Sequence, residues 1–144
     1  MITISSDGAQ ELDIVQNISF VKEGNFEKLR EELTFLKMAN FTKIPTKMIL
    51  ETGLLTDEEI KECCKIYDGE VDFVKTSSGF ANETYTGEKF KLQKINCVKL
   101  MKQNFSGEIK ASGGIRDLDF IMKLIEAGAT RIGCSSSIKL IKTF

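Results

Sequence analysis

The chain has 144 residues, with 20 Lys and Arg against 21 Asp and Glu and a net charge of -1. This length predicts one domain with a substantial core, and the near-neutral charge excludes a global positive field that would hold nucleic acid or an acidic membrane. The sequence has no histidine, which excludes imidazole relays, H-E-x-x-H zinc sites and a histidine general base, and leaves acid–base chemistry to Asp, Glu, Lys, Tyr, Cys or water.

The first half of the chain alternates between short apolar runs and amphipathic stretches. Residues 12–15 predict a buried strand with one acidic side chain, and the helical spacing of apolar residues after Asn25 predicts a helix. Residues 47–51 predict the next strand. The sequence Thr-Asp-Glu-Glu at 56–59 is a capping box and predicts a second helix, which ends near Gly69.

The second half continues the same alternation. Further strands are expected at residues 71–75, 107–110 and 131–133. Further helices are expected through residues 95–101, over 117–127 and from Ser137. Because each strand leads into a helix, the order predicts βαβ units around a parallel sheet, which is an α/β fold.

Cysteine usage and the N-terminus bear on the compartment. The four cysteines contain no C-x-x-C pair, and residues 1–10 have neither the basic nor the apolar region of a signal peptide. The apolar runs are far shorter than the roughly 20 residues that cross a bilayer. We therefore expect reduced thiols, a cytoplasmic location and no membrane partner.

Charged residues stand on the predicted strands or at their C-terminal ends, at Asp13, Glu51, Lys75 and Lys110. In α/β barrels the active site lies at that end of the strands. A nearby cation lowers the pKa of a lysine, and the neutral amine can attack a carbonyl to form a Schiff base while a carboxylate such as Asp13 passes protons. The alternative is that Lys75 and Lys110 are separate surface lysines at the edge of the sheet.

Small residues follow three of these strands, in segments 76–79, 111–114 and 133–137. Small residues before a helix expose backbone N–H groups that bind phosphate, and many barrels build this site after their last two strands. The alternative is ordinary helix capping by Ser and Gly. The phosphate-binding interpretation points to Gly113, Gly114, Gly133, Ser135 and Ser136.

Five segments taken together carry a family resemblance, namely residues 8–15, 49–55, 72–80, 109–116 and 127–136. In this order they resemble deoxyribose-phosphate aldolase, a family of Schiff-base (class I) aldolases on a (β/α)8, or TIM, barrel. The resemblance implies a lyase of deoxyribonucleotide catabolism. It would cleave 2-deoxy-D-ribose 5-phosphate reversibly into D-glyceraldehyde 3-phosphate and acetaldehyde, with no metal and no organic cofactor.

The resemblance also implies a role for each matched position. Lys75 matches the Schiff-base lysine, Lys110 the second lysine that keeps the first one neutral, and Asp13 the aspartate that relays protons with a water. Glu51 would support them by holding the lysine ammonium groups, the alternative being a solvated strand-end carboxylate. The substrate phosphate would be held at Gly79, Gly113, Gly114, Gly133, Ser135 and Ser136.

The extent of the resemblance defines the expected architecture. It begins at Gly8 and matches strands four to eight of the family, whereas a complete barrel takes about 200 residues or more. We therefore expect residues 1–144 to form a single partial TIM-barrel domain of about five β/α units, without strands one to three. Residues 82–86 and Ser112 depart from the small residues that the family often carries there.

Three functional hypotheses fit the sequence. The first is an aldolase, or the C-terminal part of one. The second is a truncated, inactive paralogue, or a half-barrel that needs a partner chain. The third is a different phosphate-binding barrel enzyme, against which the paired lysines and Asp13 argue. The expected partners are a small phosphorylated sugar and either further copies of the chain or a complementing chain, with no nucleic acid.

Overall fold

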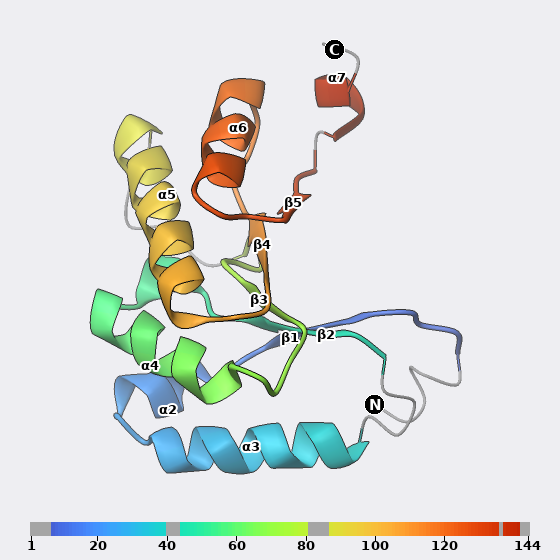
Figure 1. Ribbon diagram of the computed structural model, residues 1–144, viewed down its shortest axis with the longest axis vertical. Coiled ribbons are helices and arrows are strands. Elements are labelled where there is room, and N and C mark those ends of the chain that lie inside the picture. The colour runs from blue at the N-terminus through green and yellow to red at the C-terminus, as the bar shows by residue number, and fades with distance from the viewer. Residues whose placement is uncertain (1–6, 40–43, 81–86, 136, 142–144) are drawn as a thin grey trace.

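The structure, a computed structural model, describes residues 7–39, 44–80, 87–135 and 137–141. Its centre is a parallel sheet in the order β1-β2-β3-β4-β5 (Figure 1). The strands are β1 (Leu12–Val15), β2 (Thr46–Ile49), β3 (Phe73–Lys75), β4 (Glu108–Ser112) and β5 (Arg131–Gly133). The helices are α2 (Ile18–Lys22), α3 (Phe26–Ala39), η1 (Thr52–Leu54), α4 (Asp57–Tyr67), α5 (Gly87–Asn104), α6 (Leu118–Glu126) and α7 (Ser137–Ile141).

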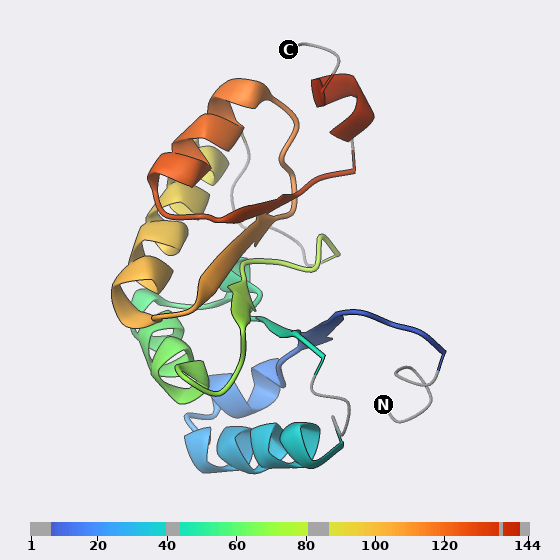
Figure 2. The same cartoon turned by 45° about the vertical axis from the view of Figure 1, so that its right-hand side comes forward.

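The longer helices, α3 to α6, line one face of the curved sheet (Figure 2). The α/β class and the five expected strands are therefore confirmed. The capping box is also confirmed, since the Thr56 side chain accepts from the Glu59 amide and the Glu59 carboxylate accepts from the Thr56 amide. Helix α2 was not expected; the Asn17 side chain caps it by accepting hydrogen bonds from two amides of its first turn.

Two boundaries differ from the sequence pattern. Strand β3 begins at Phe73, later than expected, because the Val71 amide still bonds to the Tyr67 carbonyl in the turn that ends α4. Helix α5 begins at Gly87, inside a stretch that reads as polar, while residues 82–86 lie outside the described residues.

The alternation of side chains along the strands separates an apolar face from a charged one. Met48, Val74 and Ile109 are buried in the core that the strands form with the helices. Their neighbours Lys47, Lys75 and Lys110 therefore point to the opposite, concave face. Lys75 is paired with Lys110 on the neighbouring strand, and Lys47 lies two residues before Ile49, the partner of Lys75 on the other side. The three lysines are therefore neighbours on this face.

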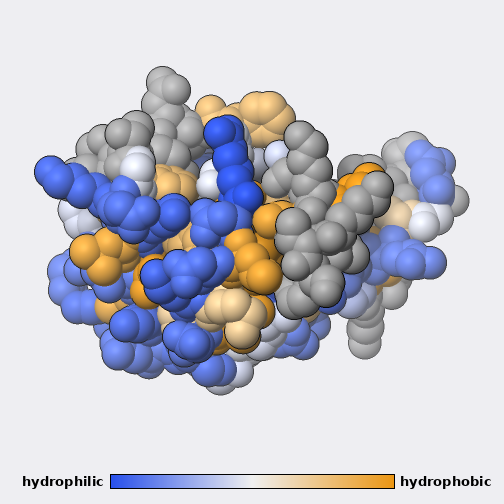
Figure 3. All heavy atoms as spheres, turned by 90° about the horizontal axis from the view of Figure 1, so that it is seen from above, coloured by the Kyte–Doolittle hydropathy of each residue, from blue (hydrophilic) through white to orange (hydrophobic). Residues whose placement is uncertain are grey.

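None of the helices that the structure describes is long and apolar enough to cross a bilayer. At the end of the molecule formed by α5, α6 and α7, apolar side chains lie in separate places among hydrophilic ones (Figure 3). Exposed apolar residues on these helices include Leu92, Met122 and Ile138. The cysteines are free, and three of them are buried in the core.

Candidate active site

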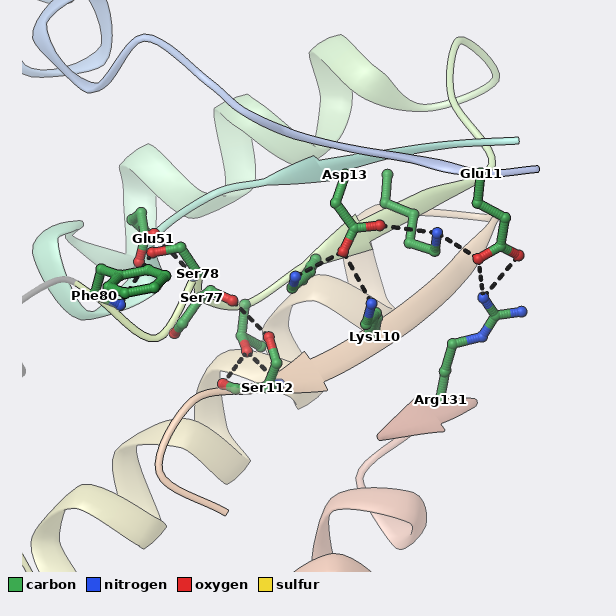
Figure 4. Close-up of polar contacts among 12 residues, drawn as sticks. Glu11, Asp13, Glu51, Ser77, Ser78, Phe80, Lys110, Ser112 and Arg131 are labelled. Atoms are coloured by element: carbon green, nitrogen blue, oxygen red, sulfur yellow. Dashed lines mark hydrogen bonds and ion pairs between the residues drawn. The ribbon is translucent and has the colours of Figure 1, made fainter. Parts of the chain in front are cut away.

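The side chains of Asp13, Lys75 and Lys110 meet on the concave face of the sheet (Figure 4). The Nζ of Lys75 donates to Oδ2 of Asp13 at 2.7 Å, and the Nζ of Lys110 donates to the same oxygen at 2.9 Å. Because one oxygen accepts both bonds, the two nitrogens lie within a few ångströms of each other. This geometry excludes the alternative of two separate surface lysines.

A third lysine, Lys47, extends this cluster. Its Nζ lies 2.9 Å from Oδ1 of Asp13 and 2.6 Å from Oε2 of Glu11, and its side chain is only 1% exposed. Glu11 in turn accepts hydrogen bonds from Nη1 of Arg131 at 2.8 and 2.7 Å, one to each carboxylate oxygen. Arg131 belongs to β5 and Glu11 precedes β1, so the network connects the two edge strands of the described sheet (Figure 4).

The ionisation of the two carboxylates follows from these contacts. Partial burial raises the pKa of Asp13, but hydrogen bonds from the three lysines outweigh burial and hold that pKa well below its usual range. Hydrogen bonds from Arg131 and Lys47 lower the pKa of Glu11 to about 2. Both groups are therefore anions at neutral pH, and each is held by more than one cation.

Beside the lysine pair lies a pocket with a cavity volume of about 410 Å³. Its lining includes both Lys75 and Lys110 together with five of the six residues expected to hold phosphate, namely Gly79, Gly113, Gly114, Gly133 and Ser135. The sixth, Ser136, lies outside the described residues. Arg116 also lines the pocket and adds a positive charge. The pocket thus places candidate amine groups and candidate anion-binding groups around one space.

Glu51 is placed differently from the expectation. Its side chain is buried, and its Oε1 accepts a hydrogen bond from the Ser78 amide at 2.8 Å. In the described part of the chain, this carboxylate contacts neither lysine, so the expected hold on the ammonium groups is wrong, as is the alternative of a solvated carboxylate. Glu51 also has a φ of 55°, the left-handed conformation. Through its bond to the Ser78 amide, the Glu51 carboxylate fixes the loop that follows β3.

Five charged residues in or beside the site were missed in the sequence, namely Glu11, Lys47, Lys94, Arg116 and Arg131. Lys47 interrupts a buried strand, and a parallel strand covered by helices is usually apolar throughout. Lys94 lies on the apolar side of α5, in step with the buried Cys97, Val98 and Met101. In both cases the available signal was a lysine at a position whose spacing predicts burial. Arg116 follows the Gly113–Gly114 turn and carried no such signal.

No protein-family model matches the chain, but curated proteins do. The deoxyribose-phosphate aldolase of Mannheimia succiniciproducens is 45% identical over 139 residues, and that of Aquifex aeolicus is 44% identical over 144 residues. These alignments cover 94% and 96% of this chain but only 58% and 60% of the two relatives. The family resemblance expected from the five segments is confirmed, and the chain spans less than two thirds of its relatives' length.

Comparison with solved structures tests the expected fold. QR15, an aldolase, superposes with a TM-score of 0.85 at 40% identity, covering 99% of this chain and 62% of that one. A deoxyribose phosphate aldolase from Aeropyrum pernix, described as having a unique tetrameric structure, gives a TM-score of 0.77 at 30% identity over 99% of this chain and 58% of that one. The expected fold, part of a TIM barrel with five β/α units, is therefore confirmed.

Proposed function

We propose that this chain carries the Schiff-base and phosphate-binding machinery of a deoxyribose-phosphate aldolase. The reaction would be the reversible cleavage of 2-deoxy-D-ribose 5-phosphate into D-glyceraldehyde 3-phosphate and acetaldehyde. The observation that carries this proposal is the shared bond of Lys75 and Lys110 to one oxygen of Asp13, beside a glycine-lined pocket that both lysines help to line. The names of the curated relatives give independent support.

The covalent step begins at Lys75. Its neutral amine adds to the C1 aldehyde carbon of the open-chain sugar, and the resulting carbinolamine loses water to give an iminium ion. The C3 hydroxyl then gives up its proton, the C2–C3 bond breaks, and the electron pair moves into the iminium to leave an enamine. D-Glyceraldehyde 3-phosphate departs. A proton returns to C2, and water hydrolyses the imine to release acetaldehyde and restore the amine.

Two neighbours assist this sequence. Lys110 donates to the same Asp13 oxygen as Lys75 and places a second positive charge beside the attacking amine. Asp13, working through a water, passes the protons that the carbinolamine and enamine steps release and take up. Lysine and carboxylate chemistry is sufficient for every step, so we propose that neither a metal nor an organic cofactor takes part.

The pocket beside the lysines is proposed to hold the substrate phosphate. Backbone N–H groups of small residues bind phosphate oxygens well, and Arg116 adds charge at the rim. A small phosphorylated sugar in the cytoplasm is thus the proposed ligand, with no nucleic acid. We also propose that further copies or a complementing chain cover β1 and β5, which are the edge strands of the described sheet, because an open sheet edge invites pairing.

Borohydride trapping tests the proposal directly. Folded protein is incubated with acetaldehyde and sodium borohydride, and the modified lysine is located by peptide mass mapping. We expect a reduced adduct on Lys75, no adduct at that peptide in Lys75→Leu, and slower trapping in Lys110→Leu. The matched control is Lys99→Leu, which alters an exposed lysine on α5 and should trap like the parent. Absence of an adduct on the folded parent, or an adduct at another lysine, would refute the proposal.

A further inference from the structure

Helix α5 sends a buried lysine, Lys94, against the back of the glycine turn that follows β4. The side chain is 3% exposed. Its Nζ donates to the Ser112 carbonyl at 2.8 Å, to the Gly113 carbonyl at 3.1 Å and to the Ser77 hydroxyl at 3.1 Å. One ammonium group therefore connects α5 to the loop after β3 and to the turn after β4.

These bonds fix the direction of two successive peptide units. In a trans peptide the carbonyl of one residue and the N–H of the next point in opposite directions, and all the described peptide bonds are trans. The Ser112 and Gly113 carbonyls point at Lys94, so the N–H groups of Gly113 and Gly114 point away from it. Both glycines line the pocket, whereas Lys94 is not among its lining residues. The two N–H groups therefore face the pocket.

The turn at Gly113 and Gly114 has little room to move, because side chains of α5 pack closely against it. Gly113 and Gly114 have φ values of 85° and 67°, which favour glycine. A Cβ added at Gly113 would lie 3.0 Å from the Lys94 Nζ, and one added at Gly114 would lie 2.7 Å from the ring of Phe90. That ring is also 4.7 Å from the Lys94 Nζ. Helix α5 thus presses on the turn with a charge and an aromatic ring from one face.

We propose that Lys94 is the positioning residue of the anion site. By holding two carbonyls on the far side of the turn, it keeps two consecutive N–H groups directed at the bound phosphate, the arrangement that makes a backbone anion site. Its own positive charge lies behind these groups in a poorly solvated place, where it favours a dianion over a neutral ligand. Lys94 does not touch the phosphate. The inference rests on the proposed function only for the identity of the molecule that carries the phosphate.

The test measures binding of inorganic phosphate by titration calorimetry, in the parent and in Lys94→Met and Lys94→Gln. We expect the phosphate Kd to rise about tenfold in the methionine variant, since it loses every donor and the charge, and to rise less in the glutamine variant, which keeps an N–H donor. The matched control, Lys99→Met, removes an exposed lysine from the same helix and should leave Kd unchanged. Trapping of acetaldehyde, which has no phosphate, should proceed at the parental rate in Lys99→Met, and in the parent it reports on the proposed function separately from phosphate binding.

Several results would overturn the inference. One is a cooperatively folded Lys94→Met protein that binds phosphate as tightly as the parent, and another is a parent that does not bind phosphate at all. If neither Lys94 variant folds, the parent decides the matter by NMR. The amide signals of Gly113 and Gly114 must then move on phosphate addition, and unmoved signals reject the inference. If the folded parent binds phosphate but acetaldehyde is not trapped on it, the aldolase proposal is refuted and the role of Lys94 still stands.

Discussion

Lys75 and Lys110 occupy paired positions on neighbouring strands, and their nitrogens bind the same oxygen of Asp13. Two cations thus share one acceptor atom, while the second oxygen of that carboxylate is taken by a third lysine. The cluster holds more positive than negative charge at the place where a carbonyl would be attacked. Asp13 is consequently the residue on which the geometry of the cluster depends.

We expect Asp13→Asn to slow trapping of acetaldehyde at Lys75 by about 100-fold, in the range of effects seen when an acid–base group is lost. The amide keeps the size of the side chain but lacks the charge that aligns the ammonium groups. The rate of adduct formation is measured by mass spectrometry. Asp119→Asn, which alters an exposed carboxylate paired with Lys123, is the control and should trap at the parental rate. Equal rates for both variants would contradict the role of Asp13.

Replacing Lys47 by methionine should lower the free energy of unfolding by about 2 kcal/mol, because Asp13 and Glu11 each lose a charged donor, although both keep another cation. Urea unfolding followed by circular dichroism measures this change. Lys61→Met removes an exposed lysine paired three residues away on α4 and should change the free energy of unfolding much less. A similar loss in both variants would show that burial of the Lys47 ion pairs has no special weight.

The low pKa of Glu11 predicts a specific dependence of stability on pH. Its pKa falls from 4.5 to about 2 on folding, so the carboxylate stabilises the fold above pH 4.5 and loses this contribution as the pH falls toward 2. Glu11→Gln should therefore be less stable than the parent at neutral pH, and the difference should shrink in acid. Unfolding curves of both proteins at a series of pH values give the comparison. A difference that is constant with pH would exclude this linkage.

Glu51→Ala should loosen the loop after β3, because the Ser78 amide loses its acceptor. The expected loss of stability is about 1–2 kcal/mol. Glu51→Gln retains an acceptor oxygen and should lose less. Hydrogen exchange of the Ser78 amide provides the direct readout and should accelerate more in the alanine variant than in the glutamine variant. Unchanged exchange in Glu51→Ala would reject a loop-fixing role for this side chain.

Periodicity and strand-end chemistry accounted for most of the fold and for the three residues at the centre of the site. Strands β1 to β5 follow from short apolar runs, and Asp13, Lys75 and Lys110 stand out because charges within such runs or at their ends are costly. Parallel pairing then brings them together on one face of the sheet. The sequence could thus predict which residues meet.

The contacts of other residues could not be predicted, because they depend on backbone conformation and on residues far away in the sequence. Glu51 stands just beyond the end of a strand, yet its backbone is left-handed and its carboxylate accepts from the Ser78 amide. Glu11 precedes the first strand and gains its importance only from Arg131, far along the chain. Lys94 lies within a helix, and its target carbonyls belong to a turn fixed by other elements.

The ion pair of Glu11 and Arg131 has a consequence for the order of folding. The two residues are 120 positions apart in sequence, and the strands to which they are attached are the first and last of the described sheet. Contacts of such long range form late, since closing a long loop costs entropy before the contact stabilises it. We therefore expect the pair to form only after the five strands have assembled. Its loss should then raise the unfolding rate more than it lowers the folding rate.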